Sequence, residues 1–596
     1  MTNKELFETR SLQFLSASEV FARQSNKYAS VRTIVFLAGL VVSIYFANER
    51  EAGSMYLSII ISFTLLVFLV SRHNKIKYNR NHNRFLATIN SEENNRIAGN
   101  IHSFDQGLEF VDDDHPYTSD LDVFGRSSLF QLINRTGTQA GRQLLAKWLQ
   151  DKADPGQIDD RQKAMESLAD QIEWRQQFQA SALHFKDESA NTDDLEEWMK
   201  GDNSFLGKRF LLGLSFVLPI CSIISLWMFF DVGLSFYWFL AVSVIGGLMI
   251  SQKLKLINHT AEQMTSSLNT IRAIRALLEK IKIAPVESTY LEDIKNQLFN
   301  EEYNILKETK NLQLLLQFFD ARSNGIYYLI NIVLMVDFHL MRAAEKWRYK
   351  NKSNLTNWVK TVAEFECINS LAGSLHSHED FVVPKITNDN QMQFISVGHP
   401  LINSAERICN DFNVEGKGKV TIITGSNMSG KSTFLRTLGV NAVMALMGGP
   451  VCAKSALVPF VSIFSGMRIK DNLEEHISSF YAELKRISQL LALLKSNEVP
   501  IFYLLDEILK GTNSKDRHLG SEALITQLAQ TNSFGIISTH DLSLGNLSTN
   551  SHQIINQNFS SSIEGNEILF DYKLKQGVCN SFNASKLMEK MGIFKS

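Results

Sequence analysis

Apolar residues gather in four long stretches in the first half of the chain. They form two pairs, residues 31–47 with 55–71 and residues 210–230 with 232–251. A helix needs roughly 20 apolar residues to cross about 30 Å of hydrocarbon, with about 17 at the short end. The pattern therefore predicts two transmembrane helical hairpins. Two buried helical hairpins in a large soluble core would give the same pattern.

The charges beside these stretches favour the membrane. Residues 72–84 hold five basic residues and no acid, whereas the hairpin tips, 48–54 and Asp231, hold one basic residue, Arg50. Other basic residues flank the second pair: Lys208, Arg209, Lys253 and Lys255. Loops rich in Lys and Arg stay in the cytoplasm, so both tips are predicted to point outward. We expect a four-span protein of the inner (cytoplasmic) membrane, with every other segment cytoplasmic. The first stretch follows several acids and is not typical of a cleavable signal peptide.

Elsewhere the spacing predicts helices first, and strands alternating with helices later. Residues 121–149 and 256–370 carry apolar residues at helical spacing, and residues 376–390 are polar, which predicts a linker. Short β-rich runs follow at 393–397, 420–424, 501–505 and 535–538. Strands that alternate with helices predict an α/β domain with a largely parallel sheet.

These patterns divide the chain into five parts. We expect an N-terminal membrane hairpin with a basic flank (1–94), the first part of a helical core (95–209), a second membrane hairpin (210–251), the second part of the helical core (252–385) and the α/β domain (386–596).

A phosphate-binding motif follows the strand predicted at 420–424. The pattern G-x-x-x-x-G-K-[ST] is matched by Gly425, Ser426, Asn427, Met428, Ser429, Gly430, Lys431 and Ser432, and Thr433 is next in the loop. The glycines let backbone N–H groups surround phosphates, and the following helix adds a favourable dipole. Lys431 is predicted to reach the outer phosphates and Ser432 to hold Mg²⁺.

Two carboxylates and a histidine follow the next predicted strands. Asp506 and Glu507 end the apolar run 501–505, and His540 follows the run 535–538. A Mg²⁺–nucleotide site needs one acid near the metal and a second to polarise the attacking water. We assign these roles to Asp506 and Glu507 in that order, and place His540 near the γ-phosphate. A histidine after a strand is also common as a purely structural residue.

Residues 325–340 form a fifth, shorter apolar segment. It contains Asn331, Asp337 and His339, each of which is expensive at the centre of a bilayer. A fifth span would also place the C-terminal third outside the cell, away from ATP. The segment is therefore predicted to be a buried or lipid-skimming helix.

The motifs together resemble one known family. The runs TGSNMSGKSTFLRTLG, LLDEILKGTNSKDR and STHD, in this order, resemble the ATPase domain of the MutS family of DNA mismatch repair proteins, a relative of the ABC-transporter ATPases. Asn427 and Met428 inside the loop are the discriminating detail. The resemblance extends to 394–400, 409–411 and 571–578, and residues 128–149 are similar to the start of the MutS core.

The resemblance implies a fold, cofactors and partners. It implies an ABC-like P-loop ATPase domain of α/β class, preceded by an all-α core and lever region, with ATP and Mg²⁺ as cofactors. MutS-type ATPases form dimers with composite sites, so a homodimer is implied, in which Ser478 and Ser479 form the signature contributed in trans. The resemblance also implies DNA as a partner. The segment 474–477, just before Ser478, lacks a glycine that is common in the family. Lys510 stands where the family commonly has arginine.

The N-terminal region departs from the family. Mismatch-binding members begin with a soluble domain that carries a Phe-x-Glu wedge, whereas residues 1–94 are mostly a membrane hairpin. We therefore expect a membrane-anchored member of the family that lacks the mismatch-recognition domain.

Composition narrows the function further. Sixty Lys and Arg against 62 Asp and Glu give a net charge of −2, which is low for a protein that binds nucleic acid by bulk electrostatics. The five cysteines lack the spacing of a zinc site, which indicates reduced thiols. Two polar clusters, 376–380 and 112–115, are interpreted as solvated segments rather than metal sites.

Three functions remain open: an ATP-driven dimeric clamp on DNA at the membrane, a membrane ATPase that acts on a non-DNA partner, and an ATP-driven dimerisation switch.

Overall fold

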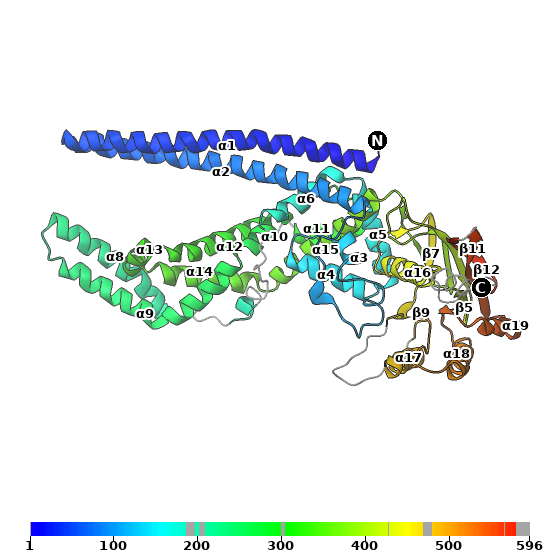
Figure 1. Cartoon of the computed structure of the whole chain (residues 1–596). Coiled ribbons are helices and arrows are strands. Elements are labelled where there is room, and N and C mark those ends of the chain that lie inside the picture. The colour runs from blue at the N-terminus through cyan, green and yellow to red at the C-terminus, as the bar shows by residue number, and fades with distance from the viewer. Residues whose placement is uncertain are drawn as a thin grey trace.

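The computed structural model describes residues 2–185, 197–201, 205, 209–299, 304–426, 428–468, 479–496, 498–564 and 567–579. Two helical arms extend from one side of a central helical core, and an α/β domain lies on the opposite side (Figure 1). The predicted order, a helical region followed by a C-terminal α/β domain, is confirmed.

The first arm is a hairpin of two long helices, α1 (Asn3–Asn48) and α2 (Ala52–Ile97). They lie side by side, and small polar groups cross the contact, such as Ser18 Oγ, which donates to Arg80 O at 3.1 Å. The helices are far longer than the apolar stretches, because their inner halves pack on the core through α6 (Ile172–Leu183). The boundary predicted after residue 94 falls inside α2, which ends at Ile97.

The second arm contains the other apolar hairpin. It consists of α8 (Arg209–Asp231) and α9 (Tyr237–Ser266), and three further helices pack along it. These are α12 (Ile305–Asp320), α13 (Gly325–Leu334) and α14 (Val336–Asn351). The span predicted from residue 232 begins later, at Tyr237, because Gly233 adopts a left-handed conformation with φ 74° that ends the preceding helix.

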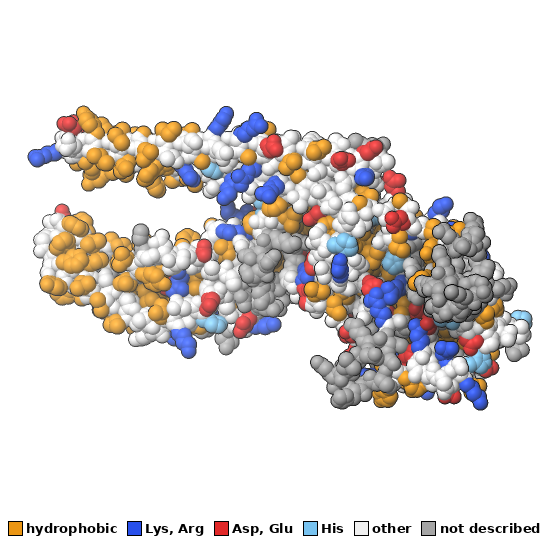
Figure 2. All heavy atoms as spheres, viewed as in Figure 1, with side chains coloured by type: hydrophobic (Ala, Val, Ile, Leu, Met, Phe, Trp, Pro, Cys, Tyr) orange, Lys and Arg blue, Asp and Glu red, His pale blue; other side chains and the backbone are white. Residues whose placement is uncertain are grey.

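Four helices of the described chain are long and apolar enough to cross a membrane: α1, α2, α8 and α9. The bent pair of α13 and α14 would raise this number to five if it formed one broken span. Apolar side chains cover the outer ends of both arms, away from the α/β domain (Figure 2). Such large exposed apolar surfaces are rare on soluble monomers.

The helical core surrounds α15 (Asn354–Ser377), which is buried along most of its length. Residues 121–149 form two helices, α3 (Leu129–Ile133) and α4 (Gln139–Gln150), because Ser128 and Thr138 each cap a new N-terminus. The other core helices are α5 (Pro155–Ala169), α6, α10 (Leu268–Lys282) and α11 (Thr289–Leu298), and η1 (Leu108–Phe110) is a short 3₁₀ turn.

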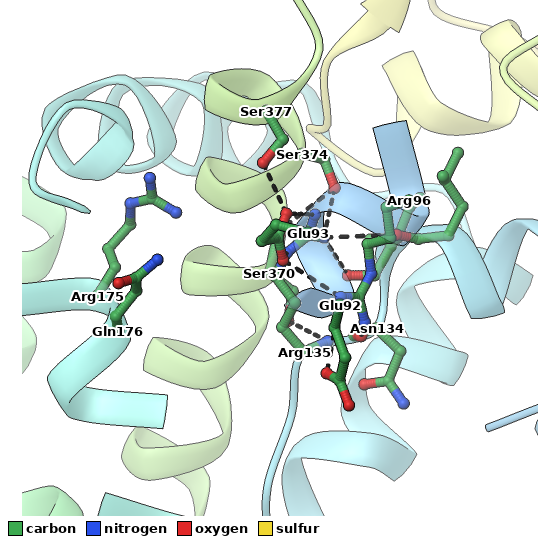
Figure 3. Close-up of polar contacts among 12 residues, drawn as sticks. Glu92, Glu93, Arg96, Asn134, Arg135, Arg175, Gln176, Ser370, Ser374 and Ser377 are labelled. Carbon is green, nitrogen blue, oxygen red and sulfur yellow. Dashed lines mark hydrogen bonds and ion pairs between the residues drawn. The ribbon is translucent and has the colours of Figure 1, made fainter. Parts of the chain in front are cut away.

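A buried ionic cluster ties α2 to this core (Figure 3). The carboxylate of Glu93 accepts hydrogen bonds from Arg135 at 2.7 and 2.8 Å and from Ser377 at 2.6 Å, and Arg96 lies 3.2 Å away. Arg135 also donates to Ser374 Oγ at 2.9 Å. The first arm is therefore joined to α15 by groups that are nearly all buried.

The segment predicted as a linker, 376–390, is part of the folded body. The helix α15 continues to Ser377, and His378 is buried and stacks on Phe381 with ring centroids 4.5 Å apart. Two strands follow, β1 (Phe381–Val382) and β2 (Lys385–Thr387), and the boundary predicted at 385/386 falls inside β2. The linker prediction was wrong because polar composition alone does not reveal pairing with β6 and β7.

The α/β domain is built on three sheets. The main sheet has the strand order β12-β11-β5-β10-β9-β8 and is parallel except for β12, so the predicted largely parallel sheet is confirmed. A four-stranded sheet has the order β2-β7-β3-β4, and β1 pairs with β6.

The remaining strands of the domain have the following bounds: β3 (Gln391–Val397), β4 (Asn410–Glu415), β5 (Val420–Gly425), β6 (Val451–Cys452), β7 (Ser455–Pro459), β8 (Ser462–Gly466), β9 (Ile501–Asp506), β10 (Phe534–Thr539), β11 (Ile554–Glu564) and β12 (Glu567–Gln576). The helical elements are α16 (Lys431–Leu446), α17 (Ser479–Ser496), α18 (Ser514–Leu528), η3 (Leu542–Asn546) and α19 (Leu547–Asn550).

A loop of the helical core, which contains His115, Pro116 and Asp120, packs against the α/β domain beside β8. Asp120 accepts hydrogen bonds from Ser465 Oγ at 2.7 Å and from the N–H of Arg468 at 2.8 Å. Arg486 of α17 donates to His115 O and Pro116 O at 3.0 and 2.8 Å. The aspartates of the polar cluster 112–115 are exposed, as predicted, and its last residue, His115, contacts α17 through its backbone carbonyl. Within the described residues, no three His, Cys, Asp or Glu side chains are grouped as a metal site.

Candidate nucleotide site

The phosphate-binding motif connects the central strand β5 to α16. Strand β5 is fully buried between β10 and β11, and α16 begins at Lys431. Gly430 has φ 101°, and an added Cβ there would lie 3.0 Å from the ring of Tyr572. An added Cβ at Gly425 would lie 2.6 Å from Phe559 O. Both glycines of the motif are therefore required by the local structure. Asn427 lies outside the described residues.

Lys431 lies inside the loop. Its ammonium group donates to Gly425 O at 2.9 Å and to Ser426 O at 3.0 Å, and the residue is only 4% exposed. Burial lowers the pKa of Lys431, although Glu507 and Asp506 oppose this effect. The loop thus holds a buried cation against its own carbonyl groups, which fits a group that meets phosphate oxygens.

Ser432 and Asp506 come together although 74 positions separate them in the sequence. Ser432 Oγ donates to Asp506 Oδ2 at 2.6 Å, and Ser538 Oγ donates to Asp506 Oδ1. The carboxyl ends of β9 and β10 meet the start of α16 here. Hydroxyl and carboxylate oxygens are the ligands that Mg²⁺ prefers, so this donor set fits Mg²⁺.

Glu507 follows β9 in a left-handed conformation with φ 50°. Its carboxylate contacts His540 Nε2 and lies 3.0 Å from Lys510 Nζ. The hydrogen bond from His540 is the main cause that lowers the pKa of Glu507 to about 2, and Lys510 adds to it against the effect of burial. Glu507 is thus an ionised carboxylate held between two basic groups at the edge of the loop.

His540 also contacts the phosphate-binding loop. Its Nδ1 lies 2.9 Å from Gly425 O, on the side of the ring opposite the nitrogen that contacts Glu507. The ring therefore bridges the loop to Glu507, and the structure brings Lys431, Ser432, Asp506, Glu507 and His540 to one place.

A cavity of about 440 Å³ adjoins the loop. Its walls include Ser426, Met428, Ser429, Gly430, Lys431, Ser432, Thr433 and Glu507, and the apolar part is formed by Val397, Ile402, Ile408, Phe434, Phe559 and Tyr572. The volume is within the usual range of small-molecule sites, about 300–1,000 Å³. The lining thus combines the phosphate-binding loop with apolar and aromatic side chains, which suits a ligand with phosphates and a planar base.

The predicted trans signature is only partly within the described chain. Ser478 lies outside the described residues, and Ser479 begins α17, with its side chain outside the description. Further along α17, Glu483 is buried and accepts from the N–H groups of Lys510 and Gly511 at 3.1 and 3.3 Å. The start of α17 is therefore tied to the segment that follows Glu507.

Three residues that the structure places at the site were given no role there by sequence reasoning. Ser538 positions Asp506, Lys510 contacts Glu507, and Tyr572 covers Gly430. The position of Ser538 one residue before the end of β10, beside β9, was a usable signal, since neighbouring parallel strands end at the same edge. Tyr572 could not be located, because β12 is antiparallel and remote in sequence.

Fold and site together define a class: a P-loop α/β domain that follows a helical region. Two MutS domain families match the chain, MutS domain III at residues 108–380 and MutS domain V at residues 421–593. These matches, together with the relatives described next, support a MutS-family protein.

The relatives cover different parts of the chain. The DNA mismatch repair protein MutS of Thermotoga neapolitana is 30% identical over 241 residues, which are 40% of this chain and 30% of the relative. The protein of the same name from Staphylococcus saprophyticus is 28% identical over 229 residues, 37% of this chain and 25% of the relative. That of Alkaliphilus metalliredigens is 24% identical over 505 residues, 76% of this chain and 55% of the relative. The chain thus spans less than a third of the length of the first two relatives.

Proposed function

We propose that this chain is a membrane-anchored, MutS-related ATPase that acts as a dimeric clamp on DNA. One observation carries the ATPase assignment: Lys431, the bonded pair of Ser432 and Asp506, and Glu507 converge at the ends of β5 and β9. In P-loop ATPases these residue types perform phosphate binding, Mg²⁺ binding and activation of water.

Each residue has a separate task in the proposed hydrolysis. Lys431 neutralises charge on the outer phosphates, and Ser432 and Asp506 would hold Mg²⁺, which supplies further charge compensation. Glu507 is ionised at neutral pH and can polarise a water molecule for in-line attack on the γ-phosphate. His540 bridges Glu507 and the loop, so it can fix the carboxylate relative to the phosphates.

The dimer is part of the proposal. Ser478 and Ser479 precede and begin α17, and a helix N-terminus is a favourable place for a phosphate. If α17 faces the loop of a second copy, each site is completed in trans. The contact of Glu483 with Lys510 and Gly511 would then link the partner-facing helix to the Glu507 of its own chain.

Membrane anchoring is supported by the two apolar hairpins, whose outer ends expose apolar side chains. By the positive-inside rule, we propose that the α/β domain lies in the cytoplasm, which is consistent with an inner-membrane protein. DNA binding is inferred from relatives that are called DNA mismatch repair proteins. The net charge of −2 favours a second candidate, an ATPase or ATP-driven dimerisation switch that acts on a non-DNA partner at the membrane.

The test is the rate of ATP hydrolysis by the purified full-length protein in lipid nanodiscs, with and without duplex DNA, over a series of salt concentrations. We expect Lys431→Ala to abolish nucleotide binding, because it removes the cation inside the loop. Glu507→Gln should bind ATP but lose most turnover, on the order of 10²-fold or more, since only the carboxylate that polarises water is removed.

The variants and the DNA series separate the alternatives. Equal loss of ATP binding in both variants would refute the division of roles between Lys431 and Glu507. Stimulation by DNA that weakens with salt supports the DNA clamp. ATP hydrolysis that does not respond to DNA, with no DNA binding at low salt, favours the non-DNA partner.

A further inference from the structure

The short helix α13 (Gly325–Leu334) is unusually apolar and exposed. None of its ten residues is charged. Several large apolar side chains on it are more than a third exposed: Tyr328, Leu329, Ile330, Ile332 and Leu334. On the preceding helix α12, Phe318 is also 55% exposed, so the apolar surface continues beyond α13. In water this surface would be unfavourable by about 25 cal/mol per Å².

A contact with α8 shows how far along the second hairpin the end of α13 lies, measured from the basic residue Arg209. His339, in the second turn of α14, lies with Nε2 3.1 Å from Ser215 O, and its ring centroid is 4.7 Å from that of Phe216. Ser215 is six residues inside α8, counted from Arg209. At 1.5 Å per residue, the contact lies about 9 Å beyond that basic residue.

Contacts with α9 give the same depth independently. An added Cβ at Gly246 would lie 2.9 Å from Ile332 O, so the backbone of α13 touches α9 at this glycine. Gly246 is seven residues before Lys253, which begins the basic flank of the hairpin. This distance corresponds to about 10 Å along the helix. Both neighbours therefore place α13 well inside the apolar part of the hairpin, near its basic end.

The chain turns back at the end of α13. Met335 is in the left-handed region with φ 51°, and the axes of α13 and α14 differ by 81°. A helix of ten residues is about 15 Å long, half of what is needed to cross the hydrocarbon. The sharp bend therefore leaves α13 too short to span.

A buried polar group fixes this bend. Asp337 is fully buried just after the bend and accepts from Arg322 at 2.9 and 3.1 Å, from Tyr327 at 2.7 Å and from Asn331 at 2.9 Å. The side chain of Asn331 in turn accepts from the N–H of Asp337 at 2.8 Å. The charge is thereby compensated inside the protein, whereas the large side chains that α13 exposes are uncharged.

We propose that α13 is a re-entrant helix inserted in the cytoplasmic leaflet, where its exposed face contacts lipid acyl chains. This inference rests on the proposed membrane anchoring. One leaflet of hydrocarbon is about 15 Å thick, so a depth of about 10 Å lies within it. The surface is continuous with the apolar faces of α8 and α9, and this continuity identifies lipid as the occupant. The Asp337 cluster holds the helix at that depth and prevents it from straightening into a fifth span.

The depth of a spin label on α13 tests the proposal. In the full-length chain with Cys221→Ser and Cys409→Ser, a nitroxide is attached at Leu329→Cys, and the protein is reconstituted in vesicles of phosphatidylcholine and phosphatidylglycerol. Collision rates with oxygen and with a water-soluble nickel chelate report depth. Two references are labelled in separate chains: native Cys221, twelve residues inside α8, in a chain with Cys409→Ser alone, and Lys346→Cys, an exposed position on α14, in the background used for 329.

We expect the label at 329 to be protected from nickel at least several-fold relative to 346, and to be shallower than the label at Cys221. Nickel access equal to that at 346, with Cys221 deep, would overturn the inference while leaving membrane anchoring intact. A depth equal to that at Cys221 would instead indicate a full span and also overturn it. Nickel access at both 329 and Cys221 would refute the membrane anchoring itself. Low access to both reagents at 329 would show that protein covers α13, which contradicts the lipid contact.

A second variant tests the role of Asp337 as a positioning residue. With the label at 329, Asp337→Asn should increase both the mobility of the nitroxide and its access to nickel, because Arg322 loses its ionic partner. Asp320→Asn, which changes an exposed acid at the end of α12, is the matched control and should leave both unchanged. Unchanged mobility and access in Asp337→Asn would show that the cluster does not hold the helix.

Discussion

At the scale of single residues, the site is notable for the way Glu507 is held. Its carboxylate lies between His540 and Lys510, and the left-handed backbone at Glu507 directs the side chain back toward the loop. Motif analysis assigned Glu507 a role, yet it gave no indication of these contacts. The low pKa of the Glu507 carboxylate is therefore caused by neighbouring residues and could not be inferred from the motif.

This arrangement predicts a change in the pH dependence of ATP hydrolysis. The pKa of Glu507 is lowered to about 2, so loss of its charge should not limit kcat/KM at any pH above about 4. Lys510→Met removes one of the two basic groups, and the pKa should rise toward the ordinary value for glutamate. In Lys510→Met, kcat/KM should therefore begin to fall with decreasing pH at a higher pH than in the wild-type protein. Lys515→Met, an exposed lysine nearby, is the control, and identical profiles for all three proteins would contradict the prediction.

At the scale of elements, the buried cluster around Glu93 determines how the first arm joins the body. Burial raises the pKa of Glu93, but the guanidinium groups of Arg135 and Arg96 more than offset this and hold the pKa far below its usual range. A carboxylate whose pKa is lowered by folding stabilises the fold above its unfolded pKa. That contribution is lost as the pH falls below about 4.5.

Glu93→Gln should therefore destabilise the protein strongly. It leaves Arg135 and Arg96 buried without their shared counter-charge, which typically costs about 3–5 kcal/mol. Glu92→Gln is the matched control, because Glu92 is partly exposed and lies 3.8 Å from Arg96, where an ion pair contributes about 1 kcal/mol or less. Thermal unfolding in detergent, followed at pH 7 and pH 4, measures both effects.

The two proteins should also differ in their response to acid. Wild-type protein should lose stability from pH 7 to pH 4, and Glu93→Gln should lose less, because its amide does not titrate. Equal unfolding temperatures for Glu93→Gln and Glu92→Gln at pH 7 would contradict the role of the cluster.

At the scale of the whole molecule, the arms and the α/β domain lie on opposite sides of the helical core (Figure 1). If the outer ends of both arms lie in one bilayer, both hairpin tips emerge on the same side. In a Cys221→Ser background, cysteines at Gly53 and Val232 should react with an impermeant maleimide added to intact cells. A cysteine at Asn79, in the basic flank, should react only after lysis. Labelling of Asn79 from outside would overturn the four-span orientation.

The proposed DNA clamp leads to a prediction about mismatches. If the proposed clamp holds DNA through contacts with phosphates, its affinity should fall with salt and should not depend on base pairing. We expect equal affinities for homoduplex and single-mismatch DNA within about 1 kcal/mol, measured by fluorescence anisotropy. A preference of more than roughly tenfold, about 1.4 kcal/mol, would indicate a recognition element elsewhere.

The sequence by itself was enough to predict the candidate nucleotide site and the broad order of the molecule. The phosphate-binding loop, Asp506 and Glu507 follow strands that the apolar runs identify, because a buried strand and a tight glycine turn are specified locally. The four apolar stretches were equally clear in the sequence, since their length and composition meet the requirement for a helix that could cross a bilayer.

Only the tertiary structure decided how distant residues pair. Glu93 meets Ser377 across 284 positions, and the polar segment after α15 is buried through strand pairing rather than free as a linker. Likewise, the proposed depth of α13 follows from the contact of its Ile332 with Gly246 and from the contact of His339, just after the bend, with Ser215, and not from its own apolar sequence. Hydrophobic periodicity is set by neighbours along the chain, whereas burial of charge and position in a bilayer depend on which elements the fold brings together.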